Sequence, residues 1–273
     1  MILQARVLVG LLAIPVLSGI IWLGYPLLTI LITLAALWGM YEFSHLARGI
    51  GARIPMVPSL LLTLLFVLNG QIAEQNGNSA LFLIIATFAV ALLWVATRPK
   101  YNIKKFIRNW LIAAIGPLYV GFLLSHALFL RESGTPLYDG RDWLFVAVFA
   151  TFASDTAAFF VGTWLGRHRM APKISPKKTW EGAAGGLAAS ICALSAMKFI
   201  FDLPIDSWES VVLGFGLGIG SQIGDLSESW VKRIAGVKDT GVVIPGHGGL
   251  LDRLDSLLVT IPVTYYSMAI IIT

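Results

Sequence analysis

The sequence has almost no cysteine and very little charge. One cysteine, Cys192, stands among 273 residues, which excludes a disulfide framework and a cysteine-rich zinc site. Only 13% of the residues are charged, about half the share found in soluble domains. Hydrophobic residues make up 57% instead, and the formal net charge is +5. We therefore expect a polytopic membrane protein in which the positive charge reports orientation, with no nucleic-acid partner.

Nine apolar segments are long enough, or nearly so, to cross a bilayer as helices, which takes about 20 residues. They lie at 7–23, 26–46, 57–72, 80–96, 110–129, 143–164, 183–201, 209–231 and 251–272. No small-x-small cleavage site follows the first segment, so we expect it to be kept as a membrane helix. The predicted fold is all-α, an integral membrane protein with about nine transmembrane helices.

Basic residues fall almost entirely in alternate connections between these segments. With the N-terminus inside, all but three of the 20 lysines and arginines lie in cytoplasmic connections, the exceptions being Arg131, Arg141 and Lys198. This bias predicts a cytoplasmic N-terminus. It also places the charged stretch 221–256 on the cytoplasmic side, which in a bacterium is the inner face of the cytoplasmic membrane.

The stretch 221–256 concentrates ionisable groups between two membrane-length segments. A third of the chain's 15 carboxylates lie in it: Asp225, Glu228, Asp239, Asp252 and Asp255. Charges at such a border cost free energy, so their density indicates a site. As a helix, 221–233 would carry one polar face, formed by Ser221, Asp225, Glu228, Ser229 and Lys232. Glycine and proline in 236–249 predict a hairpin that brings this face to Asp252, Asp255 and Ser256.

The chemistry expected of this stretch is metal and phosphate binding. Mg²⁺ takes oxygen ligands, usually one or two carboxylates together with substrate phosphates. Asp225 and Asp252 are the candidate ligands, and the alternative is a pair of helix-end carboxylates neutralised by Lys232 and Arg253. The basic side chains are candidate phosphate ligands, or else an ordinary positive cytoplasmic surface: Lys232, Arg233, Lys238 and Arg253. His247 lies between glycines that let the backbone approach a ligand closely.

Two upstream motifs are candidates for the same site. Asp155 is a lone carboxylate in an apolar segment, which must find a partner or a proton. It either pairs with a lysine for structural reasons or lies near the site. Lys177 and Lys178 precede a predicted helix that Thr179 would cap, and a helix N-terminus also suits phosphate.

Glycines recur through 214–224 without the strand that a dinucleotide-binding loop requires. Gly216, Gly220 and Gly224 are four residues apart, which predicts a smooth helix face for close packing.

The charged stretch also resembles a known signature. Its residues are Ser229-x-Val231-Lys232-Arg233, Lys238-Asp239, Gly241, Ile244-Pro245, His247-Gly248-Gly249-Leu250 and Asp252-Arg253-Leu254-Asp255. These positions match the phosphatidate cytidylyltransferase (CDP-diacylglycerol synthase) family signature without a gap. The resemblance extends upstream through 154–158 and 175–182 and so covers roughly the C-terminal half of the chain.

The resemblance implies transfer of the cytidylyl group of CTP to phosphatidate in phospholipid biosynthesis, giving CDP-diacylglycerol and pyrophosphate. It implies that Asp225 and Asp252 bind Mg²⁺ at a centre that takes a second cation in some cases, and it suggests a homodimer. The catalytic candidates are Asp225, Lys232, Asp252 and Asp255. The substrate-binding candidates are Asp155, Lys177, Lys178, Ser221, Glu228, Arg233, Lys238, Asp239, His247, Gly248, Gly249 and Arg253.

The polar loop near residue 140 divides the chain in this interpretation. Residues 1–140 would form an N-terminal transmembrane scaffold, and 141–273 a C-terminal catalytic half. Two other classes of function remain open from the residues alone: a cation-coupled membrane transporter, and a related CTP- or ATP-dependent lipid kinase.

Overall fold

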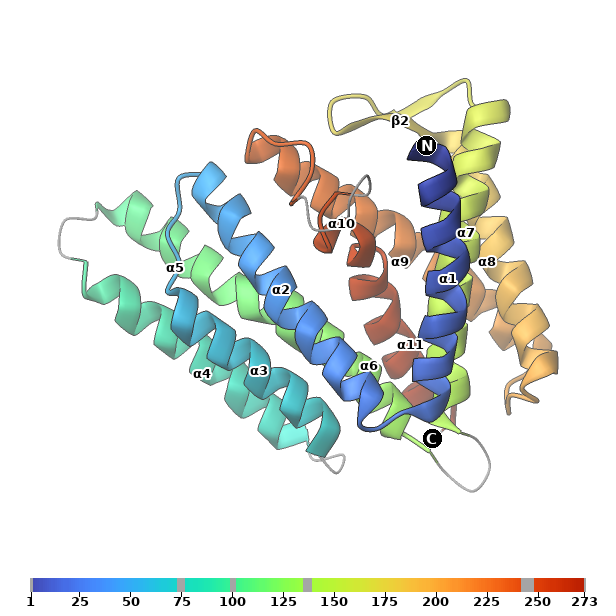
Figure 1. Cartoon of the computed structure of the whole chain (residues 1–273), viewed down its shortest axis with the longest axis horizontal. Coiled ribbons are helices and arrows are strands. Elements are labelled where there is room, and N and C mark those ends of the chain that lie inside the picture. Colours follow the sequence, from blue (N-terminus) through green and yellow to red (C-terminus); the bar gives the residue numbers. More distant parts are fainter. Residues whose placement is uncertain (1, 73–76, 99–101, 135–138, 242–247, 273) are drawn as a thin grey trace. The chain divides into compact units, whose positions relative to one another are not determined.

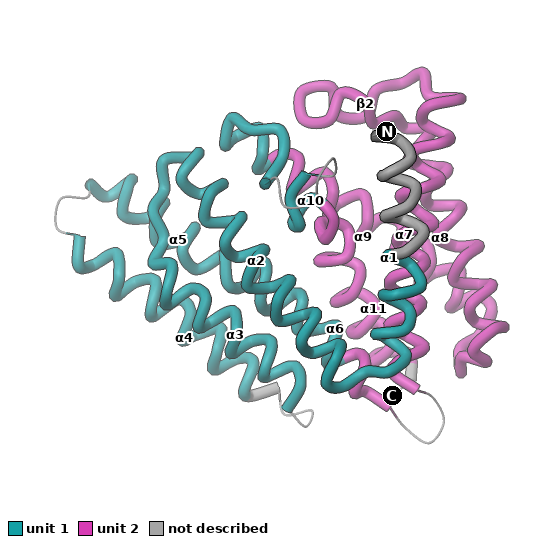
Figure 2. The backbone as a smooth tube through the Cα atoms, in the orientation of Figure 1, with its two compact units in different colours: residues 1–129, 231–252 teal, residues 130–230, 253–273 magenta. Residues whose placement is uncertain are grey.

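The computed structural model in Figure 1 is almost entirely helical. It describes residues 2–72, 77–98, 102–134, 139–241 and 248–272, without the side chains of 2–12, 77, 78 and 272. Residue contacts divide the chain into two compact units, coloured separately in Figure 2. Unit 1 comprises Met1–Phe129 and Val231–Asp252, and unit 2 comprises Leu130–Trp230 and Arg253–Thr273. The functional division at residue 140 stays a prediction.

Unit 1 holds the helices of the N-terminal half. They are α1 (Ile2–Leu23), α2 (Leu27–Gly49), α3 (Met56–Ile72), α4 (Gly77–Ala96), α5 (Ile103–Pro117), the π-helical turn η1 (Leu118–Phe122) and most of α6 (Leu123–Glu132). Pro117 has no N–H to donate, and the helix widens into η1 directly after it. A Cβ on Gly121 would lie 2.9 Å from Thr63 Cα, so this turn packs backbone-close against α3.

Unit 2 is built on α7 (Gly140–Trp164), α8 (Trp180–Ile200) and most of α9 (Ser207–Ile234). A short antiparallel hairpin, β1 (Arg169–Ala171) and β2 (Ser175–Thr179), connects α7 to α8. The all-α expectation missed this hairpin, whose polar sequence carries no apolar periodicity. Thr179 ends β2 in an extended conformation and caps α8, accepting a hydrogen bond from Gly182 N at 3.1 Å, as its position predicted.

Small residues let α7 and α8 approach closely. A Cβ on Gly182 would lie 2.7 Å from the carbonyl oxygen of Ala158 and 3.0 Å from Gly162 Cα. A larger side chain there would push the two helices apart, because backbone lies on the other side. This contact fixes the ends of both helices next to the β1–β2 hairpin.

The glycines of α9 serve two different neighbours in unit 2. Gly214 and Gly218 face α8, where added Cβ atoms would meet Ile191 and Leu187. Gly224 faces the other way, and a Cβ on it would collide with the backbone of Asp255 and Ser256. The predicted common packing face is therefore wrong at Gly216, where a Cβ would meet nothing within 4 Å.

The last apolar segment is not one helix. It forms α10 (Leu251–Leu254) and α11 (Leu257–Ile272), with Asp255 and Ser256 in the turn between them. Ser256 starts α11, since its carbonyl accepts hydrogen bonds from Val259 and Thr260. Its hydroxyl donates to the carbonyl oxygen of Ser221 in α9 at 3.2 Å. The break keeps Asp255 and Ser256 beside α9, and no local sequence pattern marks it.

Six helical segments of the described chain are long and apolar enough to cross a membrane: Leu27–Gly49, Ser79–Ala96, Ile103–Glu132, Gly140–Trp164, Trp180–Ile200 and Leu251–Ile271. Shorter apolar helices lie at Ala13–Leu23 and Met56–Ile72. Many large apolar side chains on these helices are exposed, as lipid-facing residues are, among them Phe82 at 70% and Leu93 at 68%. The protein is an all-α integral membrane protein, and the count of nine spans stays a prediction.

Candidate functional site

Unit 2 contains a cavity of about 280 Å³ between α7, the β1–β2 hairpin, α8 and α9. Its polar lining residues are Asp155, Thr163, Ser175, Lys177, Lys178, Thr179, Gln222 and Asp225. Apolar residues of α7 and α8 form the rest of the wall, among them Ala158, Phe159 and Ala183. Four of the predicted site residues therefore share one cavity: Asp155, Lys177, Lys178 and Asp225. Gln222 was not among the predicted site residues, because its uncharged amide follows no pattern that distinguishes it from other polar residues of α9.

Asp155 is held inside this cavity by two serines from other elements. Ser221 of α9 donates to Asp155 Oδ1 at 2.5 Å, and Ser256, which starts α11, lies 3.4 Å from the same oxygen. Both serines are buried. The structure thus places Asp155 in the cavity lining next to serine hydroxyl groups, and its role in the site stays a prediction.

Lys178 of β2 and Asp225 of α9 contact each other in the lining of the cavity. Their ion pair joins Lys178 Nζ to Asp225 Oδ2 at 2.7 Å, with the Asp225 side chain 38% exposed. Ser229, one turn further along α9, donates to the other carboxylate oxygen of Asp225 at 3.2 Å. Lys177, the preceding residue of β2, is exposed and lines the same cavity. One wall thus offers ammonium groups and the other a carboxylate.

Glu181 fixes the hairpin that carries these lysines. It lies in the first turn of α8 and accepts hydrogen bonds from the backbone N–H groups of Arg167 and His168, at 3.1 Å and 3.2 Å. His168 Nδ1 also lies 2.6 Å from Glu181 Oε1. These hydrogen bonds attach the base of the hairpin to α8, and so help to fix β2, which carries Lys177 and Lys178.

Further acidic groups of unit 2 lie behind Asp225. Asp255 interacts electrostatically with Asp225 and Asp155, and forms a side-chain hydrogen bond with Glu228. Glu228 is only 3% exposed. Among the residues that the structure describes, no group of three acidic, histidine or cysteine side chains is arranged to hold a metal ion. The carboxylates alone therefore do not form a closed metal cage.

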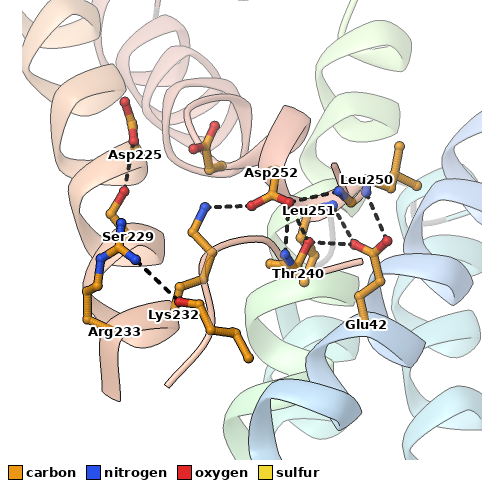
Figure 3. A network of polar contacts seen from close by, with 12 residues as sticks. Glu42, Asp225, Ser229, Lys232, Arg233, Thr240, Leu250, Leu251 and Asp252 are labelled. Carbon is orange, nitrogen blue, oxygen red and sulfur yellow. Dashed lines mark hydrogen bonds and ion pairs between the residues drawn. The ribbon is translucent and has the colours of Figure 1, made fainter. Parts of the chain in front are cut away.

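Unit 1 holds the other carboxylate predicted to bind metal, Asp252 at the start of α10. Lys232, near the end of α9, donates to Asp252 Oδ1 at 2.5 Å (Figure 3). The other oxygen, Oδ2, accepts from the backbone N–H groups of Thr240 and Gly249, at 2.9 Å and 2.8 Å, and lies 3.0 Å from the Thr240 hydroxyl. The Asp252 side chain is only 9% exposed. Donors on two sides fix its orientation.

A second buried carboxylate of unit 1, Glu42 of α2, binds residues that lie around Asp252. Its oxygens accept hydrogen bonds from Leu250 N and Leu251 N, at 2.9 Å and 2.8 Å, and from the Thr240 hydroxyl at 3.0 Å (Figure 3). The sequence reasoning missed Glu42, although a carboxylate inside an apolar segment is the signal that singled out Asp155. Applied to 26–46, it would have found Glu42.

The remaining predicted site residues are placed as follows. Arg233, Lys238, Asp239 and Arg253 are exposed. Arg233 donates to the carbonyl oxygen of Val237 at 3.5 Å. Gly248 has φ +83°, a left-handed conformation that favours glycine. A Cβ on it would lie 3.0 Å from Asp252 Oδ2. His247 lies outside the described residues, as do Ile244 and Pro245.

Comparison with known proteins identifies the family. Residues 4–271 match the model of the cytidylyltransferase family. The chain is 34% identical over 271 residues to "Phosphatidate cytidylyltransferase" of Brucella suis biovar 1 (strain 1330), covering 98% of this chain and 94% of the relative. It is 32% identical over 267 residues to the protein of the same name from Bacillus subtilis (strain 168), covering 98% of each. The protein belongs to the cytidylyltransferase family.

Proposed function

We propose that the protein is a phosphatidate cytidylyltransferase, which uses CTP and phosphatidate to make CDP-diacylglycerol and pyrophosphate. The observation that carries the proposal is the cavity of unit 2, in which Lys178 and Asp225 face each other in a chain of this family. The curated relatives described above have this activity in their names. The transporter and lipid-kinase alternatives have no such support.

The donor set fits Mg²⁺ in the way that phosphate-handling enzymes use it. Mg²⁺ binds through one or two carboxylates and takes its other ligands from water and substrate phosphate, so a closed protein cage is not required. Asp225 fits because its carboxylate is partly exposed on the cavity and already has a cation, the Lys178 ammonium, beside it. We propose that Asp225 and Asp252 are the protein ligands. When bound, Mg²⁺ would neutralise phosphate charge and stabilise the leaving pyrophosphate.

The protein's own groups have a limited chemical task. A phosphate oxygen of phosphatidate forms a bond to the α-phosphorus of CTP, and the bond from that phosphorus to the bridging oxygen of pyrophosphate breaks. The attacking monoester is already largely ionised at neutral pH, because its second pKa is about 6. A strong base is therefore not needed. Lys177 and Lys178 would offset the repulsion between two polyanions, and Asp155 and Gln222 would orient polar groups from the opposite wall.

The cavity's size supports a division of the substrate between protein and bilayer. At about 280 Å³ it falls just below the range of roughly 300–1,000 Å³ typical of sites that enclose drug-sized ligands. It suits phosphates and a headgroup, while the acyl chains stay in the membrane. We further propose nine spans, a cytoplasmic N-terminus and a site on the cytoplasmic side of the inner membrane, on the strength of the basic-residue bias. A second cation and a homodimer remain predictions from the resemblance.

An assay on purified protein tests the activity. Phosphatidate in detergent micelles is incubated with labelled CTP, with Mg²⁺ present and then with the metal chelated. We expect label in the lipid fraction and release of pyrophosphate, both dependent on Mg²⁺. Incorporation from ATP in place of CTP would indicate a kinase, and substrate flux into liposomes with no labelled lipid would indicate a transporter. Either result would overturn the proposal.

A further inference from the structure

Glu42 makes four contacts in unit 1, and in each of them the other group is the donor. Three donors belong to the segments that surround Asp252: the Thr240 hydroxyl and the N–H groups of Leu250 and Leu251. The fourth is Trp38 Nε1, one turn back in α2, at 3.2 Å. Four donors converging on one side chain suit the carboxylate form, since a protonated carboxyl group would also need an acceptor. Glu42 is only 2% exposed, so water does not compete for these contacts.

The glycines around Glu42 are shaped for this approach. A Cβ on Gly241 would lie 2.6 Å from Glu42 Oε1, and one on Gly249 would lie 2.7 Å from Glu42 Oε2 and collide with Thr240 Oγ1. Alanine at Gly241 would force the Glu42 carboxylate to move, and alanine at Gly249 would collide with both Thr240 and Glu42. The close fit indicates that the loop and the carboxylate are packed as one arrangement.

Thr240 links Glu42 to Asp252 directly. Its hydroxyl oxygen is 3.0 Å from Glu42 Oε2 and 3.0 Å from Asp252 Oδ2. A hydroxyl group has one hydrogen to donate, so only one of these carboxylates can receive it at a time. When Glu42 takes it, Asp252 keeps its backbone donors, Thr240 N and Gly249 N. Glu42 therefore sets both the backbone beside Asp252 and the direction of the hydroxyl between them.

We propose that Glu42 is a positioning residue for Asp252: it holds Thr240, Leu250 and Leu251, which lie around Asp252, by three hydrogen bonds and so fixes the carboxylate that would bind Mg²⁺. The inference rests on the role of Asp252 in the proposed function. Outer partners that orient metal ligands typically change metal affinity or activity by about 10- to 100-fold when they are altered. Glu42 acts from α2, about 200 residues earlier in the chain, as the sequence separation of 208 between Glu42 and Leu250 shows.

The main test is Glu42→Gln, which keeps the size of the side chain but puts an amide NH₂ against donors. We expect turnover to fall about 10- to 100-fold and the melting temperature to fall as well, because buried donors lose an acceptor. Hydrogen exchange should be faster at the amides of Leu250 and Leu251, and unchanged at the amides of α2. The matched control is Trp38→Phe, which removes only the donor within α2 and should keep turnover within about twofold. Wild-type turnover or wild-type exchange in Glu42→Gln would overturn the proposal.

A second pair of variants keeps the test decisive if Glu42→Gln does not fold. Thr240→Val removes the shared hydroxyl and should lower turnover, while Thr240→Ser restores the hydroxyl and most of the turnover. Equal activity in both would contradict the positioning role. Asp252→Asn is measured alongside: normal turnover there would refute the proposed site, whereas the exchange of Leu250 and Leu251 would still report whether Glu42 holds the loop.

Discussion

Asp225 of unit 2 and Asp252 of unit 1 were predicted for the same task, yet their surroundings differ. The Asp225 side chain is 38% exposed, faces a cavity and contacts two side-chain groups, Lys178 Nζ and Ser229 Oγ. The Asp252 side chain is 9% exposed and is fixed by Lys232, by two backbone N–H groups and by a loop that Glu42 anchors. One carboxylate can exchange partners, while the other is oriented in advance.

In the proposed function, these surroundings would give the two carboxylates separate contributions. An exposed carboxylate paired with a lysine can release that lysine to an incoming phosphate and take a cation in return. A buried carboxylate with fixed donors loses little freedom when it binds, which lowers the cost of ordering the site. Substitutions at the two positions should therefore differ in their effect on stability more than in their effect on activity.

The largest combined effect is expected from Asp252→Asn. The change leaves Lys232 charged and only 11% exposed without its partner, and loss of one member of a buried pair typically costs about 3–5 kcal/mol. We expect a clearly lower melting temperature in detergent, and CDP-diacylglycerol formation reduced about 10²- to 10³-fold. An unchanged melting temperature would show that the network around Asp252 contributes little to stability.

Asp225→Asn should separate activity from stability. Its ion pair with Lys178 is partly exposed, and exposed pairs contribute about 0–1 kcal/mol, so the melting temperature should hardly move. Incorporation of labelled CTP should still fall about 10²- to 10³-fold. The assay is run at several Mg²⁺ concentrations. Turnover close to that of the unmodified protein would remove Asp225 from the metal site and cancel the contrast with Asp252.

Lys178→Ala should weaken substrate binding more than it slows turnover. Hydrogen bonds to charged groups contribute about 1.5–3 kcal/mol, which corresponds to roughly a 10- to 100-fold higher KM for CTP or phosphatidate. Lys173→Ala is the matched control, since Lys173 is an exposed lysine of the same hairpin outside the cavity lining. Equal KM values for the two variants would mean that the hairpin contributes general positive charge only.

The smallest effects are expected from a pair of glycine substitutions in α9. Gly224→Ala would push a Cβ into the backbone of Asp255 and Ser256 and should destabilise unit 2 by about 1–3 kcal/mol. Gly216→Ala meets nothing within 4 Å and should be neutral, or stabilising by up to about 1 kcal/mol. Thermal melting in one detergent compares the two. If both variants were destabilised equally, Gly216 and Gly224 could not lie on a free face and a packed face of α9, respectively.

Much of the fold was predictable because membrane helices need long apolar runs. The predicted segments fall on helical parts of the chain, although the last of them is divided into α10 and α11, and Thr179 caps α8 as its position indicated. Apolar length carries no signal for a hairpin of eight strand residues, or for the break at Asp255 and Ser256, which depends on contacts with α9. Whether Gly216 packs against a neighbour depends on which helices lie beside α9, and residue spacing within one helix cannot reveal that.

The candidate site was predictable in its residue types more than in its pairings. Helical spacing indicated that Asp225 and Ser229 face the same way, and their hydrogen bond agrees. Asp155 is bound by Ser221, which lies 66 residues later in the chain. Asp225 pairs with Lys178, which lies on the β1–β2 hairpin. Only folding brings the members of each pair together. Glu42 lies 198 residues before Thr240 and belongs to no recognisable motif. A carboxylate in an apolar segment could have marked Glu42, but the distant donors that bind it could not be predicted from local patterns.

The alternation of side chains along β2 has a consequence for how the hairpin can change. Neighbouring residues of a strand point to opposite sides, and here Lys178 meets Asp225 while Lys177 is exposed at the cavity rim. Inserting one residue between Lys178 and Thr179 would exchange the directions of the two lysines while keeping Thr179 as the cap of α8. The number of residues between the lysines and α8 therefore decides which ammonium group reaches Asp225. An insertion of two residues, which restores the alternation, should be tolerated better than an insertion of one.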